Sequence, residues 1–312
     1  MNTHLSTLRP ALTRCLFILL CAATLAVTPT SRAQVLYVAQ TSGRVGTYNP
    51  ATGAAINANF ISGPNNGAFG ITVAGNKLFL SDHIANKVLT FNATTGAVIS
   101  NPFIGFLPGE LNDPTGIVIS GNDLYLVDTF KHRIERYDAT TGGGINLNLV
   151  TGLGLPISMD IFGTDLFVES NGSQPALGRY NATTGAVINE NFIPVQGIRG
   201  LKIAGNDLYV LSQGGSVLGR YNATTGAAIN ANLITQLNGG DYIEVLGNDL
   251  FVSENSANRV GRYNATTGEP INPNFITGLS GPAGLAIMVP EPGTLGLALL
   301  GGLALLRRRR VR

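Results

Sequence analysis

The central part of this 312-residue chain contains no cysteine. The two cysteines of the sequence, Cys15 and Cys21, both lie in the N-terminal segment. Residues 34–288 therefore cannot form a disulfide, and they offer neither a thiolate metal site nor a cysteine nucleophile. Tryptophan is absent from the whole chain, and long stretches of helical hydrophobic period are absent between residues 34 and 288. These absences disfavour both a helical protein and a disulfide-stapled one.

Charged residues are also scarce, at 12% of the sequence, and they are unevenly placed. Residues 34–289 contain 12 Lys and Arg against 17 Asp and Glu, whereas the two terminal segments are rich in arginine. Binding of nucleic acid requires a clustered basic surface. The sequence therefore predicts no nucleic-acid partner, despite a formal net charge of +2 for the whole chain.

The N-terminus has the three parts of a secretory signal. Arg9 and Arg14 supply the positive region, residues 15–27 are apolar, and residues 31–33 (Ser-Arg-Ala) form a small-x-small cleavage site. We expect passage through the secretion translocon and cleavage between Ala33 and Gln34. Attachment of a lipid to Cys21 is the weaker alternative, because Leu20 stands where a small residue is required.

The chain is rich in glycine, with 40 glycine residues, and these glycines follow an internal repeat. Six aromatic residues each begin a turn that ends in Thr-Gly, at spacings of 41 to 46 residues. They are Tyr48, Phe91, Tyr137, Tyr180, Tyr221 and Tyr263. A period of this length suits the four-stranded blade of a β-propeller.

Each repeat predicts four short strands with alternating apolar positions. Residues 70–73 (Gly-Ile-Thr-Val) represent the first strand, and a Gly-Asn pair supplies a two-residue hairpin. Residues 78–80 represent the second strand, an Arg-Tyr-Asn sequence marks the third, and residues 271–276 represent the fourth. Pro102 and Pro273 fall in the fourth strand, which fits the outer edge of a blade.

The two ends of the repeat region complete one further blade. Residues 35–38 form a second strand with no first strand before it, and residues 284–287 form a first strand with no second strand after it. The sequence therefore predicts an all-β, six-bladed propeller over residues 34–288, with four-stranded blades. Three N-terminal strands and one C-terminal strand close the ring.

The third repeat resembles a known family. Residues 113–119 (Asp-Pro-Thr-Gly-Ile-Val-Ile), 124–128 and 131–138 resemble the NHL repeat, within the wider class of propellers that includes the SMP-30/gluconolactonase enzymes. The other repeats are degenerate, since Ala176 and Val217 replace the third-strand arginine. The resemblance implies a six-bladed propeller and, in the SMP-30-like enzymes, metal ligands around a central channel.

Asn-Ala-Thr occurs at Asn92, Asn181, Asn222 and Asn264, which makes each a formal glycosylation sequon. The same column holds Asn49 before a proline in one repeat, and Asp138 in another. Neither of those is a sequon, yet both keep the turn. We therefore interpret the column as an Asx turn that joins the third and fourth strands.

Two columns of the first strand contain candidate residues for a channel site. In the column that begins with Phe69, only Asp241 suits a metal ligand, and Arg199 in the neighbouring repeat is expected to pair with it. The column that begins with Thr72 contains Asp160, Lys202 and Glu244. These mixed charges favour ion pairs or a solvated channel over a calcium site, which requires several anionic oxygens. No metal and no cofactor are predicted.

Other candidate sites carry less chemistry. His83 and His132 are the two histidines of the repeat region, and a catalytic zinc commonly needs three protein ligands. A polar column follows the second strand, where side chains usually cap a loop, although a shallow polar binding face is the alternative. Its members are Gln40, Asp82, Asp128, Ser170, Ser212 and Glu254.

The last 24 residues have three parts in order: Val289-Pro290-Glu291-Pro292, an apolar stretch over 295–306, and the basic cluster Arg307, Arg308, Arg309 and Arg310. The apolar stretch predicts a short hydrophobic helix of about 18 Å at ~1.5 Å per residue. A membrane span needs about 20 residues. Residues 289–312 resemble the PEP-CTERM sorting signal, which implies recognition by an exosortase while the arginines stay on the cytoplasmic side.

Together these features predict an exported, exosortase-sorted propeller that is not an enzyme. The resemblance of the tail to the PEP-CTERM signal implies a Gram-negative bacterium, transient contact with the inner membrane, and a final place at the cell surface or in the matrix. It also implies extracellular polysaccharide or an envelope protein as the expected partner. The alternative is an exported SMP-30-like lactonase or a lyase that uses the central channel. A purely structural matrix protein is the third hypothesis.

Overall fold

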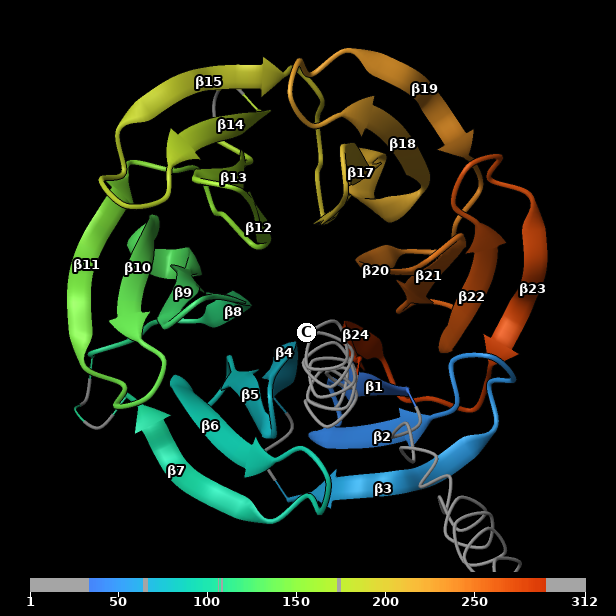
Figure 1. The fold of residues 1–312 in the computed structure, drawn as a ribbon, viewed down its shortest axis with the longest axis horizontal. Coiled ribbons are helices and arrows are strands. Elements are labelled where there is room, and N and C mark those ends of the chain that lie inside the picture. Colours follow the sequence, from blue (N-terminus) through green and yellow to red (C-terminus); the bar gives the residue numbers. More distant parts are fainter. Residues whose placement is uncertain (1–33, 64–66, 106, 108, 173–174, 290–312) are drawn as a thin grey trace, which may run out of the picture. The chain divides into compact units, whose positions relative to one another are not determined.

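The computed structural model describes residues 34–63, 67–105, 107, 109–172 and 175–289. These residues form six four-stranded antiparallel sheets, arranged as blades around a central axis (Figure 1). Blade 1 has the strand order β24-β1-β2-β3, and blades 2 to 6 follow in chain order from β4 to β23. The all-β six-bladed propeller predicted from the repeats is confirmed. The predicted C-terminal helix lies outside the described residues.

Each blade runs from an inner strand beside the axis to an outer strand at the rim. The inner strands are β24 (Pro282–Met288), β4 (Ala68–Ala74), β8 (Pro114–Ser120), β12 (Met159–Phe162), β16 (Gly200–Ala204) and β20 (Gly240–Leu246). The second strands are β1 (Val35–Gln40), β5 (Lys77–Asp82), β9 (Asp123–Asp128), β13 (Asp165–Ser170), β17 (Asp207–Ser212) and β21 (Asp249–Glu254).

The third strands are β2 (Arg44–Tyr48), β6 (Lys87–Asn92), β10 (Arg133–Asp138), β14 (Ala176–Asn181), β18 (Val217–Asn222) and β22 (Arg259–Asn264). The outer strands are β3 (Ala55–Ser62), β7 (Val98–Ile104), β11 (Gly144–Thr151), β15 (Val187–Ile193), β19 (Ala228–Ile234) and β23 (Pro270–Ile276). Pro102 and Pro273 lie on outer strands, as predicted. Two short 3-10 helices, η1 (Thr129–Lys131) and η2 (Gln213–Gly215), follow second strands.

The ring is closed within blade 1 by strands from opposite ends of the repeat region. β1 pairs with β24 in the register Val35 with Met288 and Leu36 with Ile287. On its other side β1 pairs with β2. The predicted closure, three N-terminal strands and one C-terminal strand, is therefore confirmed.

Antiparallel order gives the ring two different faces. We define the turn face as the side that carries the first-to-second and third-to-fourth strand turns, and the loop face as the opposite side. The first-to-second turns are two-residue hairpins in which glycine alone has positive φ, as at Gly75 (58°) and Gly247 (61°). This pattern fits a type II′ turn.

The Asx-turn interpretation of the Asn-Ala-Thr column is borne out in all six blades. The side-chain oxygen of each Asn or Asp accepts hydrogen bonds of 2.7–3.2 Å from the amides two and three residues later. The closing glycine of each turn has a φ between 72° and 77°. Sequon and non-sequon copies share this geometry, so the turn accounts for the column.

These turns also join neighbouring blades. A Cβ atom added to any closing glycine would lie 1.7–2.7 Å from a backbone carbonyl oxygen of the preceding blade's outer strand. The glycines are Gly53, Gly96, Gly142, Gly185, Gly226 and Gly268. In blades 3 to 6 a third-strand arginine pairs with the aspartate that opens the second strand and donates to the next blade's turn carbonyl at 2.8–3.4 Å. Arg262 makes this contact to Ala51 and so links blade 6 to blade 1.

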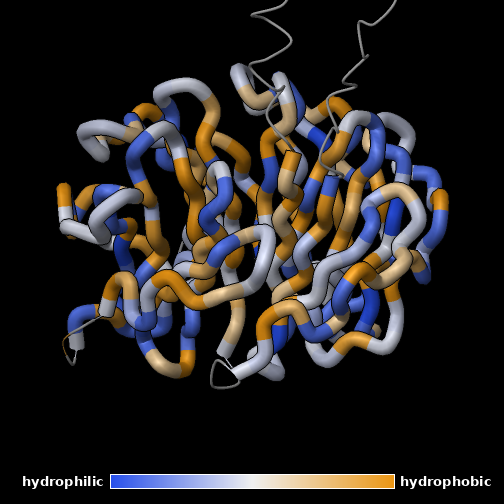
Figure 2. The backbone as a smooth tube through the Cα atoms, turned by 60° about the horizontal axis from the view of Figure 1, so that its bottom comes forward, coloured by the Kyte–Doolittle hydropathy of each residue, from blue (hydrophilic) through white to orange (hydrophobic). Residues whose placement is uncertain are grey.

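The hydrophobic core lies between blades. Each of six buried clusters draws side chains from two adjacent blades, as where Tyr37 and Met288 of blade 1 pack with Leu80 of blade 2. The second strands are buried along almost their whole length, as sheets packed on both faces require. Hydrophobic and hydrophilic stretches follow one another along the backbone (Figure 2). The Tyr37 hydroxyl donates to Ala93 O of blade 2 at 2.6 Å, so the core carries polar ties as well.

Candidate functional site

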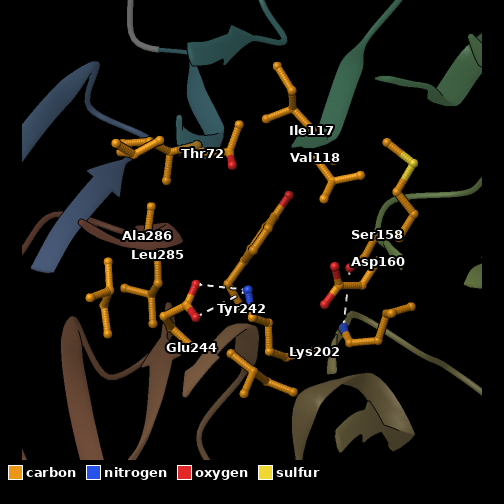
Figure 3. Close-up of a pocket in the computed structure, with 17 residues that line it drawn as sticks. Thr72, Ile117, Val118, Ser158, Asp160, Lys202, Tyr242, Glu244, Leu285 and Ala286 are labelled. Carbon is orange, nitrogen blue, oxygen red and sulfur yellow. Dashed lines mark hydrogen bonds and ion pairs between the residues drawn. The ribbon is translucent and has the colours of Figure 1, made fainter. Parts of the chain in front are cut away.

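The six inner strands surround a cavity of about 160 Å³ on the axis of the ring, which we call the axial chamber. Its walls include one residue from the Thr72 column of every blade: Thr72, Val118, Asp160, Lys202, Glu244 and Ala286. Blades 4 to 6 supply the charged members and blades 1 to 3 supply mostly aliphatic ones (Figure 3). The chamber thus has a polar half and an apolar half.

Lys202 and Glu244 form an ion pair between blades 5 and 6. Lys202 Nζ lies 3.1 Å from Glu244 Oε1 and 3.2 Å from Oε2. Burial raises the pKa of Glu244, and the neighbouring Lys202 opposes that shift. Burial lowers the pKa of Lys202, but the charges of Glu244 and Asp160 outweigh it, so the net shift is upward. Lys202 therefore remains an ammonium ion inside the chamber.

Asp160 ties blade 4 to blade 5. Its Oδ1 accepts a hydrogen bond from the Ile161 amide at 2.9 Å, and its Oδ2 accepts one from the Ile203 amide at 2.8 Å. Only 8% of the residue is exposed. Because each carboxylate oxygen has a second lone pair, both keep capacity to accept a further hydrogen bond.

Arg199 and Asp241 lie together at the loop-face mouth of the axis, as expected from the sequence. Arg199 Nε is 3.4 Å from Asp241 Oδ1, and the arginine side chain is 46% exposed. Burial raises the pKa of Asp241, while Arg199 and a hydrogen bond from Asn255 oppose that shift. A pair as open as this contributes little stability, because solvent screens it.

Tyr242 extends its ring into the middle of the axial chamber (Figure 3). Its ring stands edge-on to Phe69, with ring centroids 5.7 Å apart. Its hydroxyl oxygen is inaccessible to solvent and has no hydrogen-bond partner among the described residues. Burial raises the pKa of Tyr242, so the hydroxyl stays protonated and able to donate. Sequence reasoning did not single out this residue.

Glu169 is a second buried group that sequence reasoning missed. Its Oε1 accepts hydrogen bonds from the amides of Ile157 at 2.6 Å and Ser158 at 2.9 Å, whereas its Oε2 is buried without a partner among the described residues. Burial raises the pKa of Glu169 to about 8, against the opposing effect of those two amides. The one available signal was an acid at a second-strand position that holds Ser81 and Ser253 in two other blades.

The polar column that follows the second strand serves mainly to cap loops. Four members accept a hydrogen bond from an amide of the connection that precedes their inner strand, at 2.8–3.1 Å: Gln40, Asp128, Ser170 and Glu254. Asp82 accepts one from Ala85, and the Ser212 hydroxyl donates to Val217 O at 3.5 Å. The capping interpretation therefore holds for this column.

The histidines and acids do not gather into a ligand set in the part of the chain that the structure describes. No three His, Cys, Asp or Glu side chains there are placed to hold one metal ion. His83 pairs instead with Asp113 at 3.0 Å, and a ring nitrogen of His132 lies 3.4 Å from the Leu155 amide. The predicted lack of a metal remains a prediction.

The predicted processing residues fall largely beyond the described ranges. Gln34 and Val289 are described and exposed, whereas Ala33, the motif residues Pro290 to Pro292, and Arg307 to Arg310 lie outside. Among the described residues, no helix is long and apolar enough to cross a membrane.

Comparison with protein-family models bears on the C-terminus. Residues 289–310 match the PEP-CTERM protein-sorting motif. This chain carries a PEP-CTERM sorting motif. The motif indicates an exported protein that an exosortase processes, in agreement with the prediction from the three-part tail. Residues 19–145 match a second model, described as outer membrane protein assembly factor BamB, which covers less than half of the PEP-CTERM chain.

Solved structures show the fold of the PEP-CTERM protein but not its activity. One chain of a crystal structure of a nidogen/laminin complex is 14% identical with a TM-score of 0.66, and the match covers 83% of this chain and 100% of that one. A computationally designed protein, Ika8, is 11% identical with a TM-score of 0.43, over 78% of this chain and 74% of that one. No curated protein matches the sequence. Since 1117 chains of known structure match, the fold by itself does not select a function.

Proposed function

We propose that this protein is a non-enzymatic propeller that binds an extracellular polysaccharide or envelope protein, at the cell surface or in the matrix of a Gram-negative bacterium. The sorting motif at residues 289–310 carries the proposal, because it directs the ring out of the cell. The motif follows directly on β24, the strand that closes the ring.

The arrangement of the channel charges supports a binding role over catalysis. Lys202 pairs with Glu244, Arg199 pairs with Asp241, and Asp160 accepts two backbone amides. Each set joins two neighbouring blades or caps a strand, so these residues have a structural task. A general base or nucleophile would need an activating partner within hydrogen-bond reach of a substrate.

The export part of the proposal is tested by the intact mass of the protein recovered from its native host. We expect a chain that begins at Gln34 and has lost Arg307 to Arg312. Replacement of Pro290, Glu291 and Pro292 by alanine should leave the tail attached. Recovery of the wild-type protein with its arginine cluster intact would refute processing and favour a retained anchor.

The binding part is tested by co-sedimentation with matrix material from the host. The wild-type protein should pellet with polysaccharide, and digestion of the polysaccharide should release it. Pelleting that survives this digestion but is lost after protease treatment of the matrix would assign the partner to an envelope protein. No pelleting in either case would contradict the binding role.

A lactonase-like enzyme is the second candidate, and Glu169 is the observation that favours it. Strongly perturbed acids are frequent at catalytic sites, and the pKa of the buried Glu169 is raised to about 8 near Arg199 and Asp241. A melting temperature measured with calcium and with chelator tests the metal-dependent form of this idea, because a ligand of the folded state raises it. Hydrolysis of sugar lactones that Glu169→Gln abolishes would put the enzyme ahead of the binding module.

A further inference from the structure

The axial chamber contains one residue that departs from the repeat. Tyr242 stands in a column where four other blades have glycine: Gly70, Gly116, Gly200 and Gly284. A Cβ at those glycines would meet a carbonyl oxygen of the next blade at 2.1–2.7 Å, so the glycines serve close blade packing. Blade 6 instead directs a large aromatic side chain across the axis (Figure 3).

The hydroxyl of Tyr242 has no structural use among the described residues. It is shielded from solvent and unpaired, a state that costs about 1–3 kcal/mol for a buried polar group. Such groups are uncommon in folded proteins, and a bound molecule is one explanation for them. Two other tyrosines of the ring show the usual outcome, since Tyr37 and Tyr209 donate to backbone carbonyls of the neighbouring blade.

The remaining polar groups of the chamber restrict the charge of a ligand. Two carboxylates, Asp160 and Glu244, face one ammonium group, Lys202, which gives the wall a net charge of −1. This charge disfavours phosphates and carboxylates. A divalent metal is disfavoured as well, because Lys202 already occupies the position beside Glu244 and leaves Asp160 as the one carboxylate without a cation.

The donors and acceptors that remain suit hydroxyl groups. Tyr242 can donate, Lys202 has a third hydrogen beyond its two contacts with Glu244, and both oxygens of Asp160 can accept again. Across the chamber stand Val118, Leu285 and other aliphatic side chains. A sugar ring combines hydroxyl groups at its edge with an apolar face, so it matches both halves.

The size of the chamber limits the ligand further. The cavity volume is about 160 Å³. Pockets for drug-sized molecules are larger, at about 300–1,000 Å³. The chamber therefore has room for a single residue and not for an oligosaccharide.

We propose that the axial chamber binds one neutral sugar residue, whose hydroxyl groups bond to Lys202 and Asp160 and, after a shift of the Tyr242 side chain that exposes its hydroxyl to the chamber, to Tyr242. This inference rests on the proposed binding function and gives it a site and a ligand class. A glycan would contribute a single residue, because the chamber has room for no more.

Three probes that share one ring test the ligand class: glucose, glucosamine and glucuronate. Binding to the exported protein is measured by ligand-observed NMR and by the melting temperature. We expect glucose to bind and glucuronate not to bind, because the wall is anionic. Tighter binding of glucosamine than of glucose would overturn the neutral assignment and make the chamber a cation site. Absence of glucose binding would overturn the sugar assignment.

The variant Tyr242→Phe removes the hydroxyl and keeps the ring. Glucose affinity should fall about three- to tenfold, the effect of one lost hydrogen bond between neutral groups. The unliganded melting temperature should stay the same or rise, because an unpaired buried hydroxyl has been removed. Tyr48→Phe, far from the chamber in the third strand of blade 1, should leave glucose affinity unchanged.

Equal glucose affinity in Tyr242→Phe and the wild type would contradict the proposed role of the hydroxyl. Co-sedimentation with matrix separates this failure from failure of the proposed function. Matrix binding that persists without glucose binding rejects the chamber alone. If the wild type binds neither glucose nor matrix, the proposed binding function is rejected as well.

Discussion

The two faces of the ring are built in different ways. On the turn face every blade repeats the same Asx turn and the same closing glycine, and positive φ angles there belong to glycine alone. On the loop face the connections differ from blade to blade, and seven non-glycine residues have positive φ: Asn86, Asp113, His132, Leu155, Gln213, Gln236 and Asn258. Strained conformations of this kind often mark functional segments. The turn face therefore builds the ring, whereas the varied loop face is free to carry function.

The largest effect on stability is expected when the closing strand β1 is removed. On the turn face, an arginine of each of blades 3 to 6 donates a hydrogen bond to the next blade. Arg262 joins blade 6 to blade 1 in this way. Deletion of residues 34–44 removes β1 and none of the residues that make those turn-face contacts. We expect the cooperative unfolding transition to be lost, because the six blades share one continuous ring of packing.

Calorimetry of the deletion variant checks this expectation, and a synthetic peptide of residues 34–44 serves as the control. Addition of the peptide should restore a sharp transition. A deletion variant that melts as sharply and as hot as the intact ring would show that the turn-face contacts suffice, and the closure account would be wrong.

A second test compares two glycines of blade 4, both on the turn face. Gly185→Ala brings a Cβ to 1.7 Å from Leu149 O at a φ of 74°. Gly163→Ala has a φ of 63° but nothing within 4 Å. We expect a loss of about 2–5 kcal/mol at Gly185, from strain plus a clash, and about 1–2 kcal/mol at Gly163, from strain alone.

Urea unfolding of the two variants measures the difference. Because both carry the same kind of backbone strain, the difference isolates the contact between blades. Equal losses would mean that the neighbouring blade moves aside without cost, and the turn face would then not define blade spacing.

A third test concerns Glu169, at the loop-face end of β13. Its carboxyl has an ordinary pKa of 4.5 and a raised pKa of about 8 in the folded ring, so the folded state holds the proton more tightly over that interval. The contribution of Glu169 to stability is therefore fully present below about pH 4.5 and falls as pH rises toward 8, by up to ~1.4 kcal/mol per pH unit. Glu169→Gln should flatten this slope.

The unfolding free energy measured at several values between about pH 5 and pH 8 gives the slope. Glu190→Gln is the matched control, because Glu190 is an exposed acid on the outer strand of the same blade. A wild-type ring whose stability is constant over this interval would contradict the assignment to Glu169.

The smallest effect is expected at Leu155, an exposed loop-face leucine with a φ of 46°. Leu155→Gly relieves left-handed strain of about 1–2 kcal/mol and adds a glycine entropy cost of about 0.5–1 kcal/mol. We expect a gain of up to about 1 kcal/mol in the same urea measurement. The control is Ile84→Gly, at an exposed loop-face residue without positive φ, which should lower the free energy of unfolding. A lower free energy of unfolding in Leu155→Gly as well would contradict the strain assigned to Leu155.

The sequence predicted the features that repeat. Six spaced turns gave the number of blades, and copies such as Asn49 and Asp138 distinguished the Asx turn from a glycosylation site. The pairing of Arg199 with Asp241 was also foreseen, because both stand in one column of adjacent repeats. The ring architecture could therefore be predicted from the sequence alone.

The features that do not repeat could not be predicted from the sequence pattern. The role of Glu169 arises because β12 begins only at Met159, so the amides of Ile157 and Ser158 need another acceptor. The direction of Tyr242 across the axis depends on how six inner strands converge. Both facts belong to tertiary structure, and neither leaves a periodic signal.

The register of the closing strands has a consequence for how the ring is displayed. Val35 faces Met288 across neighbouring strands, which lie about 4.8 Å apart, and both residues are at the turn-face end of blade 1. The two ends of the ring thus leave from one point on its turn face, close to the axis. A segment attached to either end would therefore leave from the turn face. The loop face, which has the more varied surface, would then point away from the attachment and toward possible partners.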